Sequence, residues 1–228
     1  ECSPDEAIRG LLVRNYGLGW EGGEPPAWLA EVHLPAVERM ASDVAVVDEQ
    51  LTKLGEQRLQ LQEALNREQR FLEVLYETGG RLEVVVRDLL RELGLQVRDP
   101  EGPGGDDGTA ETPAGRRVVL EIKGRAGQLR LGDVRQLDQW VTDRQFPEGS
   151  PEPEQWEGLL VVNAWCETPL EERDDPYGPL ARQLAQGKGL TLITTAQLIE
   201  ALRAKQEDEF DPSNWWDRVL DTRGPFEP

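Results

Sequence analysis

The sequence predicts an α/β domain with a mixed sheet flanked by helices, preceded by a long coiled-coil helix. Three observations favour this fold class. Apolar residues recur at steps of three and four over 35–78, the rest of the chain mixes short apolar runs with helix-spaced apolar residues, and Gly and Pro separate these segments. We therefore expect an irregular segment over 1–34, a coiled-coil helix over 35–78 and a globular domain over 79–228.

The segment 35–78 carries a heptad seam. Of the twelve seam positions from Val37 to Leu75, ten are apolar, which is typical of a coiled coil. The helix is expected to begin near Pro35 and to stop at Thr78-Gly79-Gly80. A helix of roughly 60 Å at 1.5 Å per residue is too long for a compact domain and needs a partner helix. We favour a homodimer, with packing against a partner protein or a further domain as the alternative.

The globular domain is expected to alternate strands and helices. The first helix, from Leu82, ends at Gly94, and Thr195 is expected to cap a later one. Strands are expected at 95–98, near Thr109, and at 117–123, 159–162 and 190–194, and further helices at 131–142, 179–186, 195–205 and 212–220.

Composition excludes several classes of protein. Cys2 and Cys166 are the only cysteines and His33 is the only histidine, so a disulfide framework, a thiolate zinc site and nucleophile–histidine catalysis are not expected. A bound metal would need oxygen ligands, which favours Mg²⁺ or Mn²⁺. No apolar run approaches the roughly 20 residues that span a bilayer, so we expect no membrane partner and a cytoplasmic setting.

One strand carries a carboxylate and an ammonium on the same face. In the run from Val118 to Lys123 the side chains alternate, so Glu121 and Lys123 point to one side, while Leu120 and Ile122 point to the other. The carboxylate can bind a divalent cation, and the ammonium can orient water and offset charge on an attacked phosphate. Gly124 is expected to leave room for a substrate backbone. The alternative is an ion pair on an exposed strand.

Further polar residues surround this pair in the sequence. The acidic turn contains Asp106 and Asp107, the latter fourteen residues before Glu121, a spacing that suits two adjacent strands. Either Asp could share a metal with Glu121, although a solvated acidic loop remains the alternative. Glu83, on the preceding helix, could add a ligand. Downstream, Gln136 and Trp140 lie one helical turn apart and could contact a nucleotide, or Trp140 could belong to the core.

The charge distribution favours the same region. The whole chain has a net charge of −19, which argues against loose binding to nucleic acid. Between residues 116 and 135, however, six basic residues face only two acidic ones, a balance of +4. The three Arg residues that we expect to contact substrate lie in this stretch: Arg125, Arg130 and Arg135.

These motifs together resemble the PD-(D/E)XK, or restriction-endonuclease-like, nuclease superfamily. The resemblance covers residues 76–220 and rests on the stretch 76–83, the strand 119–124 and the helix 134–140. Gln136-x-x-x-Trp140 is similar to the Gln-x-x-x-Tyr motif of the RecB-type branch. The resemblance implies that Glu121 and Asp107, or Asp106, are metal ligands and that Lys123 is the catalytic lysine. Glu83, Asp106 and Gln136 would be supporting residues.

The resemblance implies a metal-dependent nuclease that hydrolyses phosphodiester bonds, in DNA rather than RNA. A role in bacterial defence or DNA processing is an expectation by analogy only. The alternative is a nuclease-like domain that has lost activity and serves as a binding or assembly module on a coiled-coil scaffold.

Overall fold

The computed structural model describes residues 33–227, apart from 101, 103 and 148–151. The expected irregular segment over 1–34 lies almost entirely outside the described residues. The chain divides into two compact units, Glu1–Leu61 and Gln62–Pro228.

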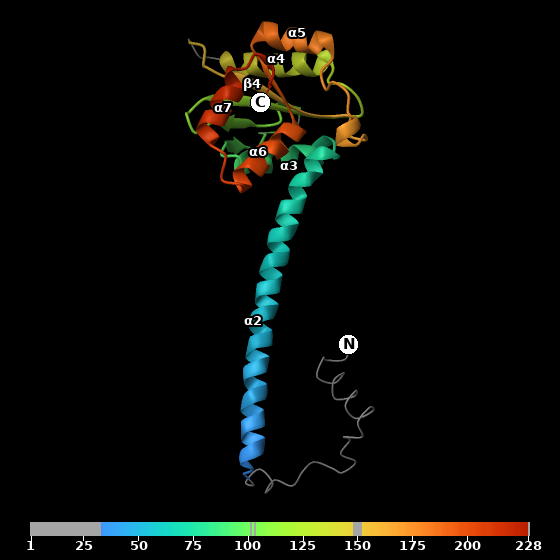
Figure 1. Cartoon of the computed structure of the whole chain (residues 1–228). Helices are drawn as coiled ribbons and strands as arrows, with labels where there is room; N and C mark the ends of the chain where they lie inside the picture. The colour runs from blue at the N-terminus through green and yellow to red at the C-terminus, as the bar shows by residue number, and fades with distance from the viewer. Residues whose placement is uncertain (1–32, 101, 103, 148–151, 228) are drawn as a thin grey trace. The chain divides into compact units, whose positions relative to one another are not determined.

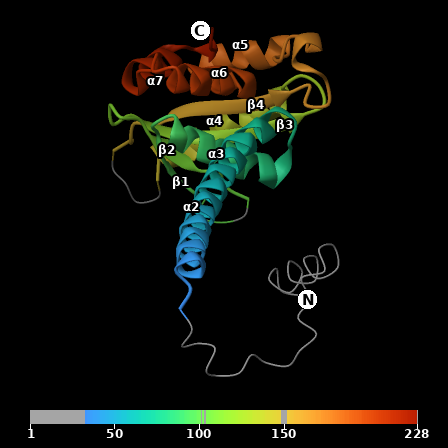
Figure 2. The same ribbon diagram turned by 60° about the horizontal axis from the view of Figure 1, so that its bottom comes forward.

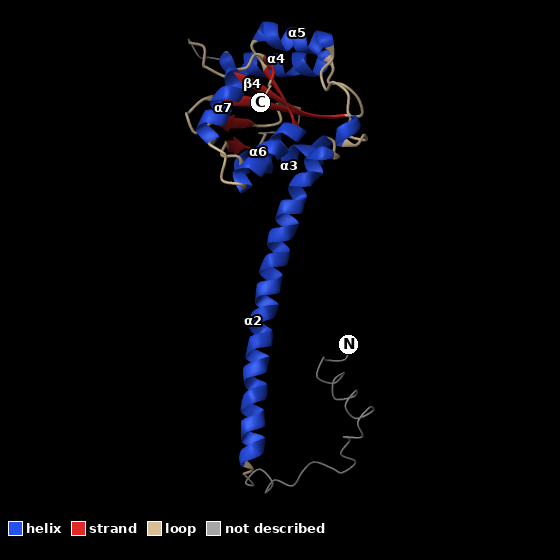
Figure 3. Cartoon of the chain, in the orientation of Figure 1, coloured by secondary structure: helices blue, strands red, loops and turns tan. Residues whose placement is uncertain are grey.

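The long N-terminal helix α2, Pro35–Phe71, begins at the predicted proline (Figures 1 and 3). Its seam is strongly exposed: Met40 is 67% and Leu61 72% accessible to solvent. The expectation that the helix continues to Thr78 is wrong, because it passes into a 3-10 turn, η2, Leu72–Leu75. The turn allows Val74 to pack in the core of the globular unit. This tertiary contact is not encoded in the heptad pattern.

A six-stranded mixed sheet forms the centre of the globular unit, in the order β1-β2-β3-β4-β5-β6. The first three strands are antiparallel, whereas β3 to β6 are parallel. β3 and β4 run side by side with eight residue pairs in register (Figure 2). The strands are β1 Gln96–Arg98, β2 Thr109–Glu111, β3 Arg117–Arg125, β4 Glu157–Ala164, β5 Thr191–Thr194 and β6 Gly224–Pro225.

Helices cover both faces of the sheet, as predicted (Figure 1). Alternation along β3 separates two cores. Leu120 and Ile122 pack with α3, α6 and α7, whereas Val119 packs with α4 and α5. The fold class predicted from the sequence is therefore confirmed. The helices are α3 Gly79–Glu92, α4 Leu131–Gln145, α5 Pro179–Lys188, α6 Thr195–Gln206 and α7 Pro212–Asp221, and a 3-10 turn, η3, covers Leu170–Glu172.

Local details agree with the sequence expectations at Gly94 and differ from them at two other points, the cap of α6 and the strand β6. Gly94 has φ +94°, as expected of the residue that ends α3. The cap of α6 is Thr194, whose hydroxyl accepts the backbone N–H of Gln197, and not Thr195. Thr195 is buried instead, with its hydroxyl 3.4 Å from Asn163 Oδ1. The short strand β6 was not expected at all. Within the described residues, no helix is both long and apolar enough to cross a membrane.

Candidate active site

The β3 strand presents Glu121 and Lys123 toward α4. Both residues follow the alternation that places Val119 in the core beneath α4 and α5. Lys123 Nζ forms an ion pair with Glu121 Oε1. Glu121 is fully buried, and Lys123 is largely buried, with 20% of its side chain accessible. The predicted pairing of a carboxylate and an ammonium on one strand face is therefore present, and it lies inside the domain rather than on an exposed strand.

Asp107 reaches this pair from the acidic turn before β2. Its backbone N–H donates to Leu120 O at 3.1 Å, and its Oδ2 accepts the Ile122 N–H at 2.7 Å. The same oxygen lies 3.8 Å from Lys123 Nζ. Arg87 fixes the turn from α3 by donating to the Asp107 carbonyl at 3.0 Å. Two carboxylates from neighbouring segments thus converge on one ammonium group.

Asp106 points away from the pair, so the structure distinguishes the two aspartates. Its Oδ1 accepts the Gly108 N–H at 3.2 Å, which stabilises the turn. Its Oδ2 pairs with Arg144 Nη2 at 3.0 Å. Asp106 is consequently a residue that holds the turn in place, and Asp107 is the one that shares the site with Lys123.

Electrostatics at the site follow from burial. Burial raises the pKa of Glu121 to about 7, and the negative charge of Asp107 acts in the same direction. Lys123 and the indole N–H of Trp140 lower it in part. Burial opposes the charge of Lys123, but Glu121 and Asp107 outweigh this effect and raise its pKa. Glu121 is therefore poised between its two protonation states near neutral pH, whereas Lys123 stays cationic.

Glu83 belongs to the same electrostatic group, although the described part of the chain shows no hydrogen bond between it and the other members. It is part-buried on α3, and burial together with Asp107 raises its pKa, against the effects of Arg87 and Lys123. This arrangement suits the supporting role expected from the sequence. It does not make Glu83 a direct partner of Glu121.

The polar atoms of Glu121 are compatible with a divalent cation. Both of its carboxylate oxygens are buried without a hydrogen bond of normal geometry among the described residues. The ammonium of Lys123 compensates this buried carboxylate in part through Oε1, and Oε2 can accept a second positive charge. The described residues contain no group of three or more His, Cys, Asp or Glu side chains arranged around one ion. Mg²⁺ typically uses one or two carboxylates and keeps several waters, so Asp107 and Glu121 fit it.

The α4 residues predicted to support the site separate into two groups. Trp140 is part-buried against the core, and its Nε1 lies near Glu121 without a normal hydrogen bond. Gln136 and Arg135 are exposed on α4, and neither has a hydrogen bond to Glu121 or Lys123 in the described part of the chain. The structure therefore brings Trp140 to the site and leaves Gln136 exposed to solvent on α4.

The predicted substrate-binding arginines are not equivalent. Arg125 forms a close ion pair with the buried Asp133, so its guanidinium already has a carboxylate partner. Asp133 also accepts the Arg130 N–H at 3.0 Å at the start of α4. The side chains of Arg130 and Arg135 are exposed. Of the three, Arg130 and Arg135 remain the residues available for a phosphate.

Gly124 has a different role from the one predicted. A Cβ atom at this position would lie only 2.8 Å from Thr78 Cα. The glycine therefore allows the start of α3 to pack against the end of β3, and it does not provide space for a substrate backbone. The sequence could not show this, because Thr78 and Gly124 meet only in the folded chain.

Sequence reasoning also missed a clamp at the carboxyl end of β4. Asn163 is fully buried and donates to Glu77 O at 3.0 Å, while its Oδ1 accepts from Arg173. Arg173 also donates to Leu75 O and Thr168 O. The clamp fixes the chain between η2 and α3, from which Glu83 extends toward the site. A polar residue at the end of an apolar strand was the only signal of it in the sequence.

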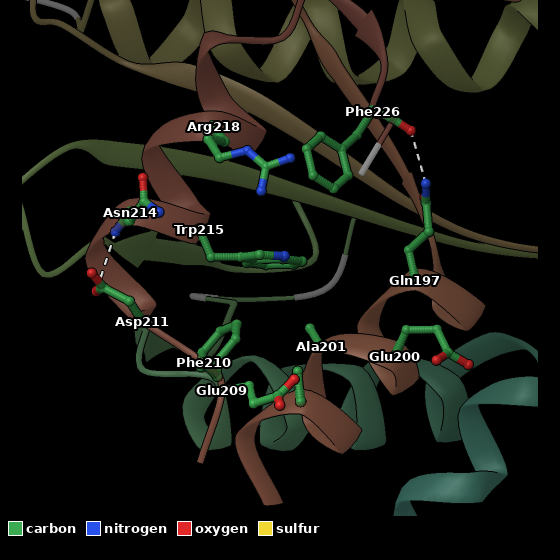
Figure 4. A pocket seen from close by; sticks show the side chains of 11 residues that line it. Gln197, Glu200, Ala201, Glu209, Phe210, Asp211, Asn214, Trp215, Arg218 and Phe226 are labelled. Carbon is green, nitrogen blue, oxygen red and sulfur yellow. Dashed lines mark hydrogen bonds between the residues drawn. The ribbon is translucent and has the colours of Figure 1, made fainter. Parts of the chain in front are cut away.

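A separate hollow of about 300 Å³ lies among α6, α7 and the chain end, and it includes none of the candidate site residues (Figure 4). Phe210 and Phe226 pack on either side of Trp215, with ring centroids 5.6 Å and 5.8 Å from it. These rings extend the core on the opposite face of the sheet from Glu121. The lining of the hollow carries Glu200, Glu209 and Asp211 against the single cation Arg218, and this negative balance disfavours a phosphate there.

Comparisons with known proteins give distant structural similarities. No family model matches the chain, and no curated protein matches it. Among solved structures, an EndoMS–dsDNA complex is similar at 21% identity and a TM-score of 0.37, over 53% of this chain and 46% of that one. A repair endonuclease from Pyrococcus abyssi is similar at 21% identity and a TM-score of 0.38, over 52% and 47%. The chain thus matches just under half the length of these neighbours, and a likeness this remote transfers no activity.

Proposed function

We propose that this chain is a metal-dependent nuclease that hydrolyses phosphodiester bonds in nucleic acid, with DNA preferred over RNA. The observation that supports this proposal most directly is the convergence of Asp107, Glu121 and Lys123. Two carboxylates from neighbouring segments and one ammonium meet at the carboxyl half of β3. Glu121 Oε1 forms an ion pair with Lys123, and its Oε2 has no hydrogen bond among the described residues.

In this proposal Asp107 and Glu121 hold one Mg²⁺ or Mn²⁺ ion. When bound, such an ion supplies Lewis-acid activation of water and neutralises charge on the phosphate. Asp107 is oriented for this role because its backbone N–H donates to Leu120 O and its Oδ2 accepts the Ile122 N–H, which fixes its position beside β3. Glu121 is oriented because the strand and the surrounding core fix its side chain. The protein therefore contributes a rigid pair of oxygen ligands.

Lys123 acts as a hydrogen-bond donor and a positive charge. The neighbouring carboxylates raise its pKa, so it keeps its proton at neutral pH and cannot serve as a general base. Its ammonium can orient the attacking water and stabilise the charge that develops on the phosphate oxygens. Arg130 and Arg135, exposed on the start of α4, extend the positive charge along the substrate.

The test is cleavage of labelled duplex and single-stranded oligonucleotides, with Mg²⁺, with Mn²⁺ and with a chelator. We expect cleavage that requires the metal and falls by about 100-fold or more in the Lys123→Ala variant. Lys205→Ala is the matched control, because Lys205 binds Glu92 at the other side of the unit. Specific binding of nucleic acid without any cleavage would instead favour the inactive binding module.

We expect the two aspartates of the acidic turn to differ in their effect. Asp107→Asn should lower cleavage by about 100-fold or more, because it removes one of two anionic ligands. Asp106→Asn should change cleavage only a few-fold, since an Asn oxygen can still accept the Gly108 N–H. The measurement is metal affinity by calorimetry together with cleavage rate. Equal losses in both variants would contradict the assignment of Asp107.

We also propose that α2 mediates a homodimer. Its seam side chains between Val37 and Leu65 are about half or more exposed in the single chain. Burying a Leu side chain stabilises by about 1.5–3 kcal/mol, so a seam of this length is sufficient for a stable pair. A dimer would place two candidate sites in one particle, which suits cuts on both strands of a duplex.

Sedimentation of the full chain tests the dimer. We expect a dimer for the wild type and a monomer for a variant with both Leu51→Glu and Leu54→Glu, because the two added charges would be buried in the seam. Thr52→Glu with Gln60→Glu adds the same charge off the seam and should remain dimeric. A monomeric wild-type chain at micromolar concentration would reject the proposal.

A further inference from the structure

Helix α4 is tied to the rest of the domain at both of its ends, on either side of Glu121. Near its start, Asp133 Oδ2 accepts a hydrogen bond from Arg125 Nε at 3.1 Å, at the end of β3. Near its other end, Arg144 Nη2 pairs with Asp106 Oδ2 at 3.0 Å, in the acidic turn before β2. These two contacts hold the middle of α4 over the centre of β3.

Trp140 lies in this middle part of α4, on the side that faces the sheet. Steps of four, three and four residues share one side of a helix, and this side carries Asp133, Leu137, Trp140 and Arg144. Leu137 is fully buried in the core beneath α4, and Trp140 packs against the same core cluster. The indole of Trp140 is therefore directed toward β3 and not toward solvent.

The spacing along both elements places Trp140 at the level of Glu121. From Asp133 to Trp140 the helix advances by about 10 Å, at 1.5 Å per residue. From Arg125 back to Glu121 the strand covers about 13 Å, at 3.3 Å per residue. Because the Arg125–Asp133 ion pair fixes a common starting point, the indole and the carboxylate lie next to each other.

Trp140 and Glu121 carry complementary polar groups that are both unsatisfied. The Trp140 Nε1–H is a buried donor without an acceptor among the described residues, and Glu121 Oε2 is a buried acceptor without a donor there. Burial raises the pKa of Glu121, and the Trp140 N–H acts against this effect, as a donor beside a carboxylate does. Buried polar groups are nearly always paired in native proteins, so these two groups are suited to each other.

A carboxylate has room for this donor as well as for a cation. Its two oxygens together accept at about four positions. Lys123 uses one of them through Oε1, and it does so with a long and flexible side chain. A second donor from α4 fixes the plane of the carboxylate and still leaves positions for a cation on the side of Asp107.

We propose that Trp140 is a positioning residue that orients Glu121 for the divalent cation, by donating a hydrogen bond from its indole N–H to the carboxylate. The proposal rests on the metal site of the nuclease function proposed above. Hydrogen bonds to metal-binding side chains typically change metal affinity by about 10- to 100-fold when they are removed. Trp140 thus contributes to metal affinity, and it does not contact a nucleotide as the sequence pattern had suggested.

The test is calorimetric titration of the full chain with Mn²⁺ in the absence of DNA, for the wild type and for Trp140→Phe. Phe keeps an aromatic ring against the core but has no donor. We expect metal affinity to fall by about 10-fold or more. Affinity for labelled DNA, measured in a chelator, should not change. Excess Mn²⁺ should restore most of the cleavage rate.

Trp156→Phe is the matched control. Trp156 is also part-buried against the core cluster beneath α4, but its Nε1 donates to Glu154 Oε2 at 3.0 Å, outside the candidate site. Thermal melting with and without Mn²⁺ separates positioning from packing. A packing loss lowers both melting temperatures alike, whereas a positioning loss reduces the increase that the metal causes. We expect the smaller increase in Trp140→Phe and an unchanged increase in Trp156→Phe.

The indole signals of the wild-type chain give a second measurement that depends on no variant. Each of the seven Trp residues contributes one Nε1–H signal to a nitrogen-15 spectrum. We expect Mg²⁺ to move the Trp140 signal with the same midpoint as metal binding, and to leave the Trp156 signal in place. A Trp140 signal that stays in place at saturating Mg²⁺ would overturn the proposal.

The outcomes also separate this proposal from the nuclease function. Unchanged metal affinity in Trp140→Phe, together with weaker DNA binding, would reject the positioning role and favour a nucleotide contact. Metal binding that depends on Trp140, without any cleavage by the wild type, would support the positioning role and reject the nuclease. A wild-type chain that binds neither Mg²⁺ nor Mn²⁺ would reject both.

Discussion

Lys123→Ala is expected to reduce cleavage by about 100- to 1000-fold, the loss typical of removing one preorganised donor from a charged transition state. A second effect adds to the first. Lys123 lowers the pKa of Glu121, so its removal leaves that carboxyl more strongly protonated at neutral pH. The variant should therefore bind metal more weakly, and its residual activity should shift toward higher pH. The measurement is the cleavage rate at saturating metal from pH 6 to pH 9.

Lys123→Arg distinguishes charge from shape at the same position. A guanidinium keeps the positive charge but is planar and larger than an ammonium. We expect Lys123→Arg to keep the wild-type dependence of the cleavage rate on pH at the acidic end of the range. It should recover only a small part of the wild-type cleavage rate. An alanine variant that cleaves as fast as Lys205→Ala would show that the ion pair with Glu121 is purely structural.

Glu121→Gln is expected to abolish metal-dependent cleavage while stabilising the metal-free protein. The pKa of Glu121 in the fold is about 7, against a reference of 4.5. Its protonated form is thus favoured by folding, and that contribution is fully present below pH 4.5. It is lost as the pH rises through 7, where the ionised group costs on the order of 3 kcal/mol. Gln lacks this charge, so the variant should be more stable than the wild type above pH 7.

Chemical denaturation at pH 5 and pH 8 without metal measures this difference. We expect the gap between Glu121→Gln and the wild type to be small at pH 5 and largest at pH 8. Added Mg²⁺ should narrow it by stabilising the wild type alone. Metal affinity of the wild type should fall as the pH drops below 7, because a proton then competes for the carboxylate. A variant less stable than the wild type at pH 8 would contradict the buried-charge argument.

Much of the fold follows from local sequence patterns. The start of α2 at Pro35, the alternation of Leu120 and Glu121 along β3 and the stop at Gly94 were all predicted. They were predictable because backbone periodicity and the conformational limits of Pro and Gly act over a few residues. The end of α2 was not, since Val74, which lies outside the heptad seam, packs in a core made by distant segments.

The sequence by itself determined the two faces of β3 and the nature of the candidate chemistry, because alternation and side-chain type are local properties. Only the tertiary structure decided between Asp106 and Asp107, by pairing Asp106 with Arg144 from α4 and placing Asp107 beside Lys123. It also assigned Gly124 to packing against Thr78. These outcomes depend on contacts between segments far apart in the chain. No local pattern encodes such contacts, because they form only when the segments meet in the fold.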